Sequence, residues 1–454
     1  MTRVHWIVGA GLAVLAASAG LAGQAQQAAP TVQPRPRIGT PTPETLGRII
    51  LPGTQALFDG YVRDGKMPGI IGAFGVGDRP TWFVEAGHVS LDPGAAAVTP
   101  DTLWRVYSMT KPVTAMAAMI LIEEGKIGLD DPVSKYIPTF AKMTVATDPE
   151  KSLASVPAVR PITVRMLLTH TSGLTYNIIA KGALLKEYER LGLVPAAVNT
   201  QVEAVARRTR PATLAEFANR IAQAPLIAQP GTQWNYSEGL DVMGRVIEVA
   251  SGMPFDRFVH TRIFAPLKMT SSFWTVPRSD VGRLATNYAF VGDTLTPLDP
   301  ARSSVWLSPP SFPYGGAGLA MSARDYDRFL HMLADEGTLD GVRIMKPETV
   351  RLAMSNLLPA GVTFGGVGGA TGGTQSATPM GFGAGGSVYL ADGPGGMPSK
   401  GTYGWGGAAG TVAFVDPVKK VRGTIMVNYF PADRWPVREQ TVAAFAGDLT
   451  RLRP

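Results

Sequence analysis

The chain has 454 residues, of which 45% are hydrophobic and 17% charged, so it is long enough for one large domain with an insertion or for two domains. Its formal charge is +7, but it has no run of five or more basic residues and no alternating basic and aromatic stripe; nucleic acid is therefore not an expected partner. The absence of cysteine excludes a cysteine nucleophile, a thiolate metal site and lipid attachment at cysteine.

Residues 1–25 have the pattern of a secretory signal peptide. Arg3 precedes an apolar stretch from Trp6 to about Gly23, and small residues suited to cleavage follow. An uncleaved anchor is the alternative, but a stretch so rich in glycine and alanine is barely apolar enough to span a bilayer. We therefore expect a periplasmic or secreted protein without a stable membrane span after cleavage. A proline-rich linker is expected over residues 26–43.

Residues 44–130 are predicted to form the N-terminal part of an α/β domain. Apolar residues at helical spacing predict a helix from about Pro43 to Asp64. Two strands are expected next, over residues 69–77 and 81–89, because both segments are apolar or alternating and are bounded by turn residues. The stretch 102–126 then indicates a short strand that turns into a helix ending near Gly125.

Residues 131–300 are predicted to form a mostly helical domain, because the strand signal fades and helical patterns dominate. Residues 301–454 return to the α/β domain, with two helices, a glycine-rich segment at 361–386 that is either a lid or disordered, and a last helix near the C-terminus. Three alternating segments at 381–392, 408–417 and 421–429 predict strands. The sheet-forming segments thus lie at both ends of the chain.

Ser108 and Lys111 in "SMTK" are the first candidate catalytic pair. A serine hydroxyl needs a proton acceptor, but none of the five histidines lies near a Gly-x-Ser-x-Gly motif, which is absent, as is His-Glu-x-x-His. A partly desolvated lysine can serve instead, and residues three apart share one face at a helix start, where an oxyanion is favoured. The alternative is a helix-capping serine with a solvated lysine, since about one Ser-x-x-Lys is expected by chance.

Three further stretches follow "SMTK" in order: "LLTHTSGL" (167–174), "WNYSEGLDVMGRVIE" (234–248) and the segment 404–429 that begins "GWGGAAG". With them, residues 45–450 resemble the serine β-lactamase and penicillin-binding-protein superfamily, closest to class C β-lactamases and their relatives the family VIII carboxylesterases. This resemblance implies an α/β (α+β) fold of the β-lactamase type: an antiparallel sheet, flanked by helices from both chain ends, with a mostly helical inserted domain. It implies neither a metal nor an organic cofactor.

The resemblance also implies roles for individual residues. Ser108 is the acylated nucleophile, with Lys111 as its partner, and Tyr236 is the general base that acts with Lys111, since a phenol beside an ammonium group loses its proton more readily. An ordinary half-buried aromatic residue is the alternative for Tyr236. His170 lies in a family signature, but its flanking residues favour a structural role in a turn that ends a helix.

Trp405, Gly406 and Gly407 fall where β-lactamases carry Lys-Thr-Gly on the strand that edges the active site. The glycines would let the substrate lie against this strand, and the amides of Ser108 and Ala408 would form the oxyanion hole. A turn with a surface tryptophan is the alternative reading of this segment.

Two departures from the family pattern favour an ester substrate. Glu238 replaces an asparagine beside the substrate and is expected to contact the substrate or to pair with Lys111. Trp405 replaces a lysine, so a cation that would bind an anionic amide substrate is missing. The leading hypothesis is an exported serine carboxylesterase acting on a small-molecule ester. The alternatives are a β-lactamase or D-amino-acid peptidase, and an inactive penicillin-binding or scaffold protein; oligomeric state is left open.

Overall fold

The computed structural model describes residues 43–366 and 378–452. The expected signal peptide, nearly all of the expected linker and the middle of the glycine-rich segment lie outside these residues. The main sheet is antiparallel and has seven strands, in the order β12 (Met380–Phe382), β13 (Ser387–Tyr389), β14 (Tyr403–Gly406), β15 (Val412–Asp416), β16 (Val421–Met426), β1 (Gly69–Val76) and β2 (Trp82–Gly87). Strands from the two chain ends meet where Ile71 pairs with Met426, so the expected assembly of the sheet is confirmed.

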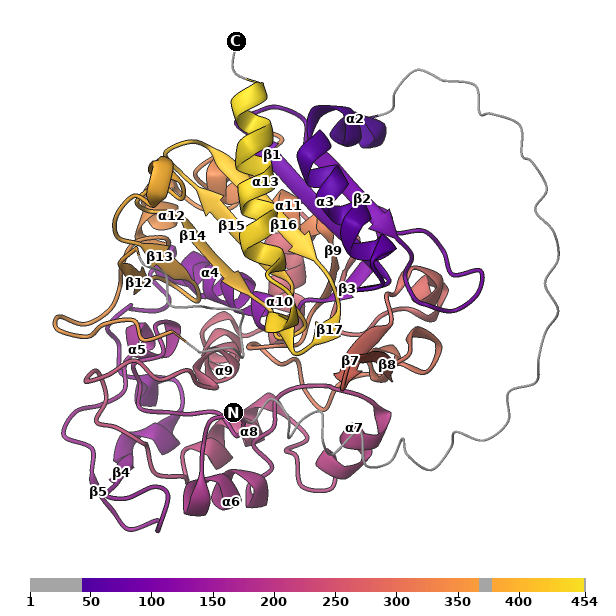
Figure 1. Ribbon diagram of the computed structural model, residues 1–454. Helices are drawn as coiled ribbons and strands as arrows, with labels where there is room; N and C mark the ends of the chain where they lie inside the picture. Colours follow the sequence, from indigo (N-terminus) through magenta and orange to yellow (C-terminus); the bar gives the residue numbers. More distant parts are fainter. Residues whose placement is uncertain (1–42, 367–377, 453–454) are drawn as a thin grey trace, which may run out of the picture.

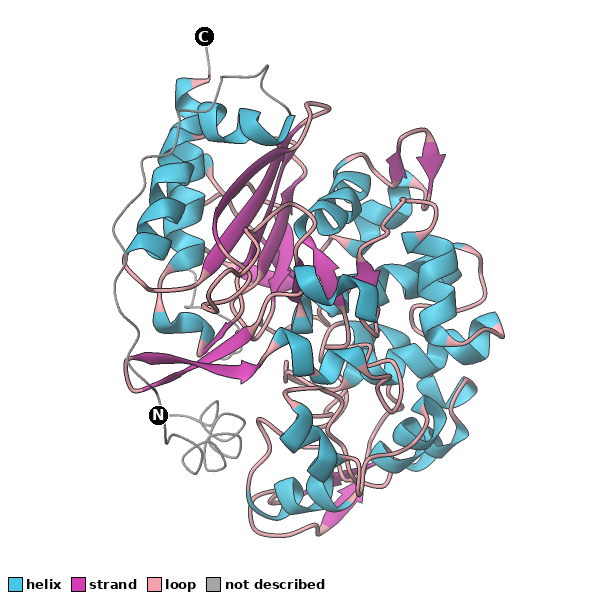
Figure 2. Ribbon diagram, turned by 90° about the vertical axis from the view of Figure 1, so that its right-hand side faces the viewer, coloured by secondary structure: helices cyan, strands magenta, loops and turns pink. Residues whose placement is uncertain are grey.

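Helices cover both faces of this sheet (Figures 1 and 2). The outer face carries α2 (Pro43–Ile50), α3 (Pro52–Arg63) and α13 (Val437–Arg451), whereas α4 (Thr110–Glu123) and α11 (Ala323–Ala334) lie on the inner face. Alternation along β1 explains the two layers: Ile70 and Phe74 point into the outer core, where Phe74 stacks on Phe445 of α13, and Ile71 and Ala73 point into the inner core.

The helical region between the sheet-forming segments contains α5 (Val164–Leu168), α6 (Gly182–Arg190), α7 (Thr200–Ala206), α8 (Leu214–Ile221), α9 (Gly239–Ser251) and α10 (Phe255–Val259). It also contains two hairpins that the sequence pattern did not predict, β4 (Thr144–Ala146) with β5 (Ser155–Pro157) and β7 (Asn287–Val291) with β8 (Thr294–Asp299). Pro297 interrupts the alternation of β8, and Pro157 ends β5, which explains why the pattern was weak.

The helix predicted over residues 43–64 is two helices. Pro52 lacks an amide proton and occupies the first turn of α3, where no intrahelical bond is lost, and the chain changes direction at Leu51. Short strands complete the fold: β3 (Leu103–Arg105), β6 (Ser272–Phe273) and β9 (Ala320–Ser322) form one sheet, and β17 (Tyr429–Phe430) pairs with β7. The remaining elements are β10 (Thr338–Leu339), β11 (Val342–Arg343) and α12 (Pro347–Ala353).

A buried ion pair anchors β3, the strand that leads to Ser108. Both Nε and Nη2 of Arg105 donate to Asp299 Oδ2, at 2.9 and 2.6 Å, and Ser304 Oγ donates to the same oxygen. The other carboxylate oxygen accepts the amide of Val305. The side chains of the pair are 0% and 1% exposed, so loss of one partner would leave an uncompensated buried charge.

Replacing Asp299 with alanine is therefore expected to lower the free energy of unfolding by about 3–5 kcal/mol, measured by urea denaturation. Asp130→Ala is the matched control, because Asp130 is 67% exposed and pairs with Arg165 at the surface; its cost should be about 1 kcal/mol or less. Equal losses in the two variants would contradict the argument.

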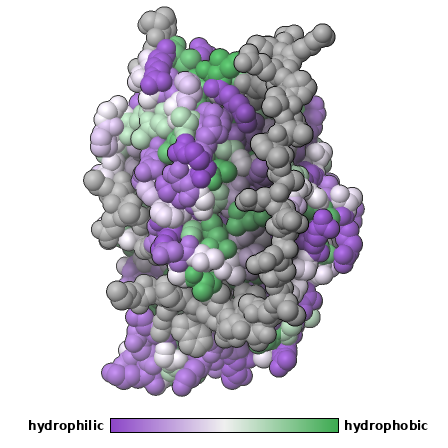
Figure 3. Space-filling model, turned by 45° about the vertical axis from the view of Figure 1, so that its right-hand side comes forward, coloured by the Kyte–Doolittle hydropathy of each residue, from purple (hydrophilic) through white to green (hydrophobic). Residues whose placement is uncertain are grey.

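Hydrophilic side chains surround smaller groups of hydrophobic ones on the face seen in Figure 3. Within residues 43–366 and 378–452, no helix has the length and apolar character that crossing a membrane requires.

Candidate active site

A single helical turn, Tyr107–Met109, joins β3 to α4 and presents Ser108. Tyr107 has a positive φ of 41°, a conformation that costs a non-glycine residue about 1–3 kcal/mol and persists only when packing enforces it. The Tyr107 ring is buried edge-on against Trp306 and Phe430, and its hydroxyl accepts a hydrogen bond from Asn287 Nδ2. Tertiary packing therefore fixes the backbone immediately before Ser108.

The structure brings together the hydroxyl, amine and phenol that the sequence singled out. Lys111 Nζ donates to Ser108 Oγ at 3.3 Å and to the carbonyl of Gly316 at 2.8 Å. The Tyr236 hydroxyl is hydrogen-bonded to Ser108 Oγ at 2.7 Å, and Lys111 Nζ lies 4.5 Å from the centre of its ring. Lys111 is fully buried and the residue that caps α4 is Met109, so the reading of a solvated lysine and a capping serine is wrong.

Tyr176 and Asp241 extend this network and were not predicted from the sequence. Lys111 Nζ donates to the Tyr176 hydroxyl at 3.2 Å, and this hydroxyl donates to Asp241 Oδ2 at 3.4 Å. Asp241 Oδ1 accepts the amide of Gly316 at 2.9 Å, and the carbonyl of the same residue holds Lys111. Asp241 therefore fixes the amine by two routes, through a phenol and through a peptide unit.

Burial governs the protonation of these supporting groups. Desolvation raises the pKa of Asp241 to about 6, although the nearby Lys111 ammonium opposes the shift. Desolvation, reinforced by the negative charge of Asp241, raises the pKa of the Tyr176 phenol well above its usual value. Tyr176 therefore stays protonated at neutral pH and can donate its hydrogen bond to Asp241.

Glu238 lies at the start of α9 and is 0% exposed. It forms no ion pair with Lys111, and neither of its oxygens has a side-chain hydrogen-bond partner. Desolvation and the charge of Asp241 raise its pKa well above the usual value, which favours the neutral acid. The expected pairing with Lys111 is therefore absent, whereas the expected contact with substrate stays a prediction.

The end of β14 lies against the turn that carries Ser108. A Cβ atom on Gly407 would lie 2.3 Å from the carbonyl oxygen of Val106, so only glycine permits this approach. The amide of Ala408 donates no hydrogen bond within the described residues, and the amide of Ser108 lies in the first turn of a helical segment, where amides lack intrahelical acceptors. Neither amide is therefore committed to an acceptor within the described residues.

Aromatic side chains pack beside Ser108 and Lys111. We call Tyr176, Tyr236, Phe382 and Trp405, with Trp234 and Phe364 packed against them, the aromatic cluster. Ring centres lie 5.8 Å apart for Tyr236 and Trp405 and 4.8 Å apart for Trp234 and Phe364. Trp405 is only 7% exposed, so it is not the surface residue that the alternative reading required. The cluster offers apolar area and no charge to a bound group.

His170 supports the aromatic cluster from behind. It follows α5 with a positive φ of 57°, and its Nδ1 accepts the amide of Ser237 at 3.2 Å. Its ring lies 4.9 Å from that of Tyr236. Desolvation and the charge of Lys111 lower its pKa well below the usual value, so the imidazole is neutral. Through these contacts His170 packs against the Tyr236 ring and holds the backbone of Ser237, which agrees with a structural role.

Replacing Asp241 with asparagine is expected to lower kcat for an ester by about 10–100-fold, because the amide removes a charged hydrogen-bond acceptor from the two routes that fix Lys111. Glu238→Gln is the matched control, since this equally buried carboxyl has no hydrogen bond to Lys111, Tyr176 or Gly316. Its kcat should change much less. A similar loss in both variants would point to general damage.

The same substitution is expected to change how stability depends on pH. Asp241 keeps its proton to about pH 6 in the folded protein but only to about pH 4 when unfolded, so the folded state binds more protons in between. Stability should therefore fall as pH rises from 4 to 6, by about 3 kcal/mol from this residue. Urea denaturation at several pH values should show this decrease in the free energy of unfolding in the wild type and not in Asp241→Asn. If the free energy of unfolding depends on pH in the same way in both proteins, the prediction is wrong.

Three comparisons with known proteins found relatives of this chain. The Beta-lactamase family model matches residues 54–446. Protein Rv1367c of Mycobacterium tuberculosis is 32% identical over 425 residues, covering 89% of this chain and 96% of its own length, and esterase EstB of Burkholderia gladioli is 30% identical over 392 residues, covering 82% and 89%. The solved structure described as EstCE1, a hydrolase with promiscuous acyltransferase activity, has a TM-score of 0.70 and 26% identity, covering 88% of this chain and 99% of EstCE1.

Proposed function

Because the chain belongs to the Beta-lactamase family and is a hydrolase of the serine β-lactamase fold, we propose that it is an exported carboxylesterase that forms an acyl-enzyme on Ser108. The hydrogen bonds that join Ser108 to Lys111 and Tyr236 support the assignment of the nucleophile and its proton acceptor.

The proposal that the protein is exported rests on the pattern of residues 1–25. N-terminal sequencing of the protein recovered from a periplasmic fraction tests it, and an intact N-terminus starting at Met1 would contradict it.

The proposed reaction has two halves. In the first, Ser108 Oγ attacks the ester carbonyl carbon, Tyr236 with Lys111 receives the hydroxyl proton, and the amides of Ser108 and Ala408 stabilise the oxyanion. The bond to the alkoxy oxygen then breaks, and the proton passes to the departing alcohol. In the second half, a water molecule gives its proton to the same base and attacks the acyl carbon. The carboxylic acid leaves and Ser108 regains its hydrogen.

The observation that carries the preference for esters is Trp405. Its indole lies within the aromatic cluster, at the position where the family pattern has a lysine, and no cation of the cluster is available to bind a substrate carboxylate. An apolar wall stabilises the hydrocarbon part of an uncharged ester, whereas it gives no compensation for burying the carboxylate of a β-lactam.

A panel of p-nitrophenyl esters from acetate to decanoate, run beside nitrocefin, tests this proposal. We expect kcat/KM for at least one ester to exceed that for nitrocefin by several orders of magnitude. Faster turnover of nitrocefin would establish a β-lactamase instead, and no turnover with no labelling by a fluorophosphonate would indicate a scaffold protein. Adding an alcohol to the ester assay separates hydrolysis from acyl transfer, the second activity for which EstCE1 is described.

A further inference from the structure

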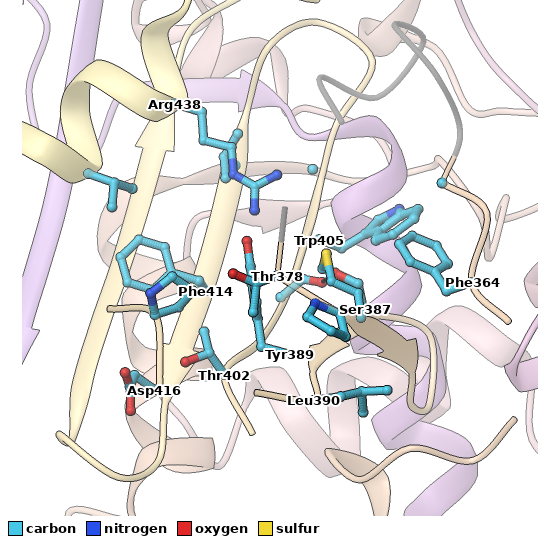
Figure 4. Close-up of a pocket in the computed structure, with 18 of the residues that line it drawn as sticks. Phe364, Thr378, Ser387, Tyr389, Leu390, Thr402, Trp405, Phe414, Asp416 and Arg438 are labelled. Atoms are coloured by element: carbon cyan, nitrogen blue, oxygen red, sulfur yellow. Dashed lines mark hydrogen bonds between the residues drawn. The ribbon is translucent and has the colours of Figure 1, made fainter. Parts of the chain in front are cut away.

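A cavity of about 640 Å³ lies on the outer face of the sheet, beside α13 (Figure 4). Its walls come from β12, β13, β14 and β15, from the first half of α13 and from the loops at residues 363–366 and 397–398. None of Ser108, Lys111 and Tyr236 lines it. The volume is in the range that holds small organic ligands, which is roughly 300–1,000 Å³. The cavity is therefore large enough for a small organic ligand and is separate from Ser108, Lys111 and Tyr236.

Most of the cavity wall is apolar. The main contributors are Met380, Leu390, Phe414 and Val442, and β14 adds the bare backbone of Gly404 and Gly406. Phe364 and Trp405 belong both to this wall and to the aromatic cluster, so one side of the cavity borders the active site. A hydrocarbon chain bound here would remove this apolar surface from water.

Arg438 supplies the charge of the site. It is half-buried on α13 and points its guanidinium into the cavity (Figure 4), and within the described residues it forms no hydrogen bond or ion pair. The two carboxylates of the lining do not neutralise it. Asp416 accepts the amides of Ser399, Val418 and Lys419, and Glu439 is exposed and forms no ion pair with Arg438. An anion would therefore find an available guanidinium at the edge of an apolar space.

We propose that this cavity binds an aliphatic carboxylate, with the carboxylate on Arg438 and the chain against the apolar wall that ends at Trp405 and Phe364. A carboxylate matches the guanidinium because two parallel N–H groups can donate to its two oxygens. A neutral alcohol of the same length would keep the apolar contacts but lose this pairing, and an amine would be repelled. The proposal does not depend on the ester substrate proposed above.

Isothermal titration of full-length Ser108→Ala enzyme with decanoate, decanol and decylamine tests the proposal, since this background cannot turn over an ester. We expect decanoate to bind most tightly. Arg438→Gln should weaken decanoate binding by about 10–100-fold and leave decanol unchanged. Arg451→Gln is the matched control, because Arg451 lies on the same helix with a side chain that is 70% exposed, and it should leave both affinities unchanged.

A second variant tests the position of the chain. Val442→Trp fills the cavity from α13 without changing its charge and is expected to weaken decanoate and decanol alike. In the wild-type background, Arg438→Gln should retain the kcat for a short ester, because Arg438 does not contact the catalytic groups. Decanoate binding that survives both substitutions, equal binding of decanoate and decylamine, or no saturable binding would each overturn the proposal.

Discussion

Replacing Ser108 with alanine is expected to reduce kcat for a p-nitrophenyl ester by roughly 10⁴–10⁶-fold, which is the loss seen when a covalent nucleophile is removed from a serine hydrolase. The physical reason is that, among the residues that the structure describes, no other hydroxyl is hydrogen-bonded to both Lys111 and Tyr236. The oxyanion donors and the apolar walls would remain, so a small residual rate and an almost unchanged KM are expected. Initial rates at saturating ester measure the effect.

Covalent labelling gives this prediction an independent readout. A fluorophosphonate should modify the wild-type protein with a stoichiometry of about one, and peptide mapping should locate the label on Ser108. The Ser108→Ala protein should remain unlabelled while its thermal midpoint stays near that of the wild type, because the substitution removes a single oxygen atom. If the Ser108→Ala protein keeps its activity and is still labelled, the nucleophile is a different residue.

Tyr236→Phe is expected to lower kcat by about 10²–10⁴-fold, the usual contribution of a positioned acid or base. The phenylalanine keeps the ring beside Trp405 and His170 but removes the hydroxyl that lies 2.7 Å from Ser108 Oγ. Tyr176→Phe is a matched control, because its hydroxyl bonds to Lys111 and Asp241 rather than to Ser108. It should lose about 10–100-fold, as expected for the loss of one hydrogen bond to a charged group.

The rate of acylation distinguishes these two tyrosines. If Tyr236 accepts the serine proton, Tyr236→Phe should slow the labelling of Ser108 by a fluorophosphonate much more than Tyr176→Phe does. Both variants need a check of folding, by circular dichroism and thermal unfolding, because both rings belong to the aromatic cluster. A larger loss in Tyr176→Phe than in Tyr236→Phe would reverse the assigned roles.

The sequence predicted the architecture because its signals are local. Apolar or alternating segments at both chain ends predicted the strands of the main sheet. The start of α11 was predicted from Ser322, whose side chain accepts the amide of Asp325. The family resemblance placed Tyr236 near Ser108 although 128 positions separate them. Pattern alone could not have shown this proximity, since it results from the packing of α9 against α4.

The parts that were missed depend on tertiary contacts. Tyr176 follows a turn, and nothing in its neighbourhood indicates that its hydroxyl bonds to Lys111. Asp241 offered a weak signal, because a carboxylate flanked by Leu240 and Val242 in an apolar helix is either exposed or has a buried partner. Glu238 was read as a substrate contact because it stands at the third position of the tyrosine motif, where the family pattern has an asparagine, whereas its side chain is buried at the start of α9.

The pairing of β1 with β16 also constrains how the protein can be made. Ile71 finds its partner Met426 only after nearly the whole chain has left the ribosome, so until then one side of β1 remains an open edge in the nascent polypeptide. Such an edge is prone to pair with other chains during synthesis. Truncations that remove β16 should therefore yield insoluble aggregates rather than a smaller folded product.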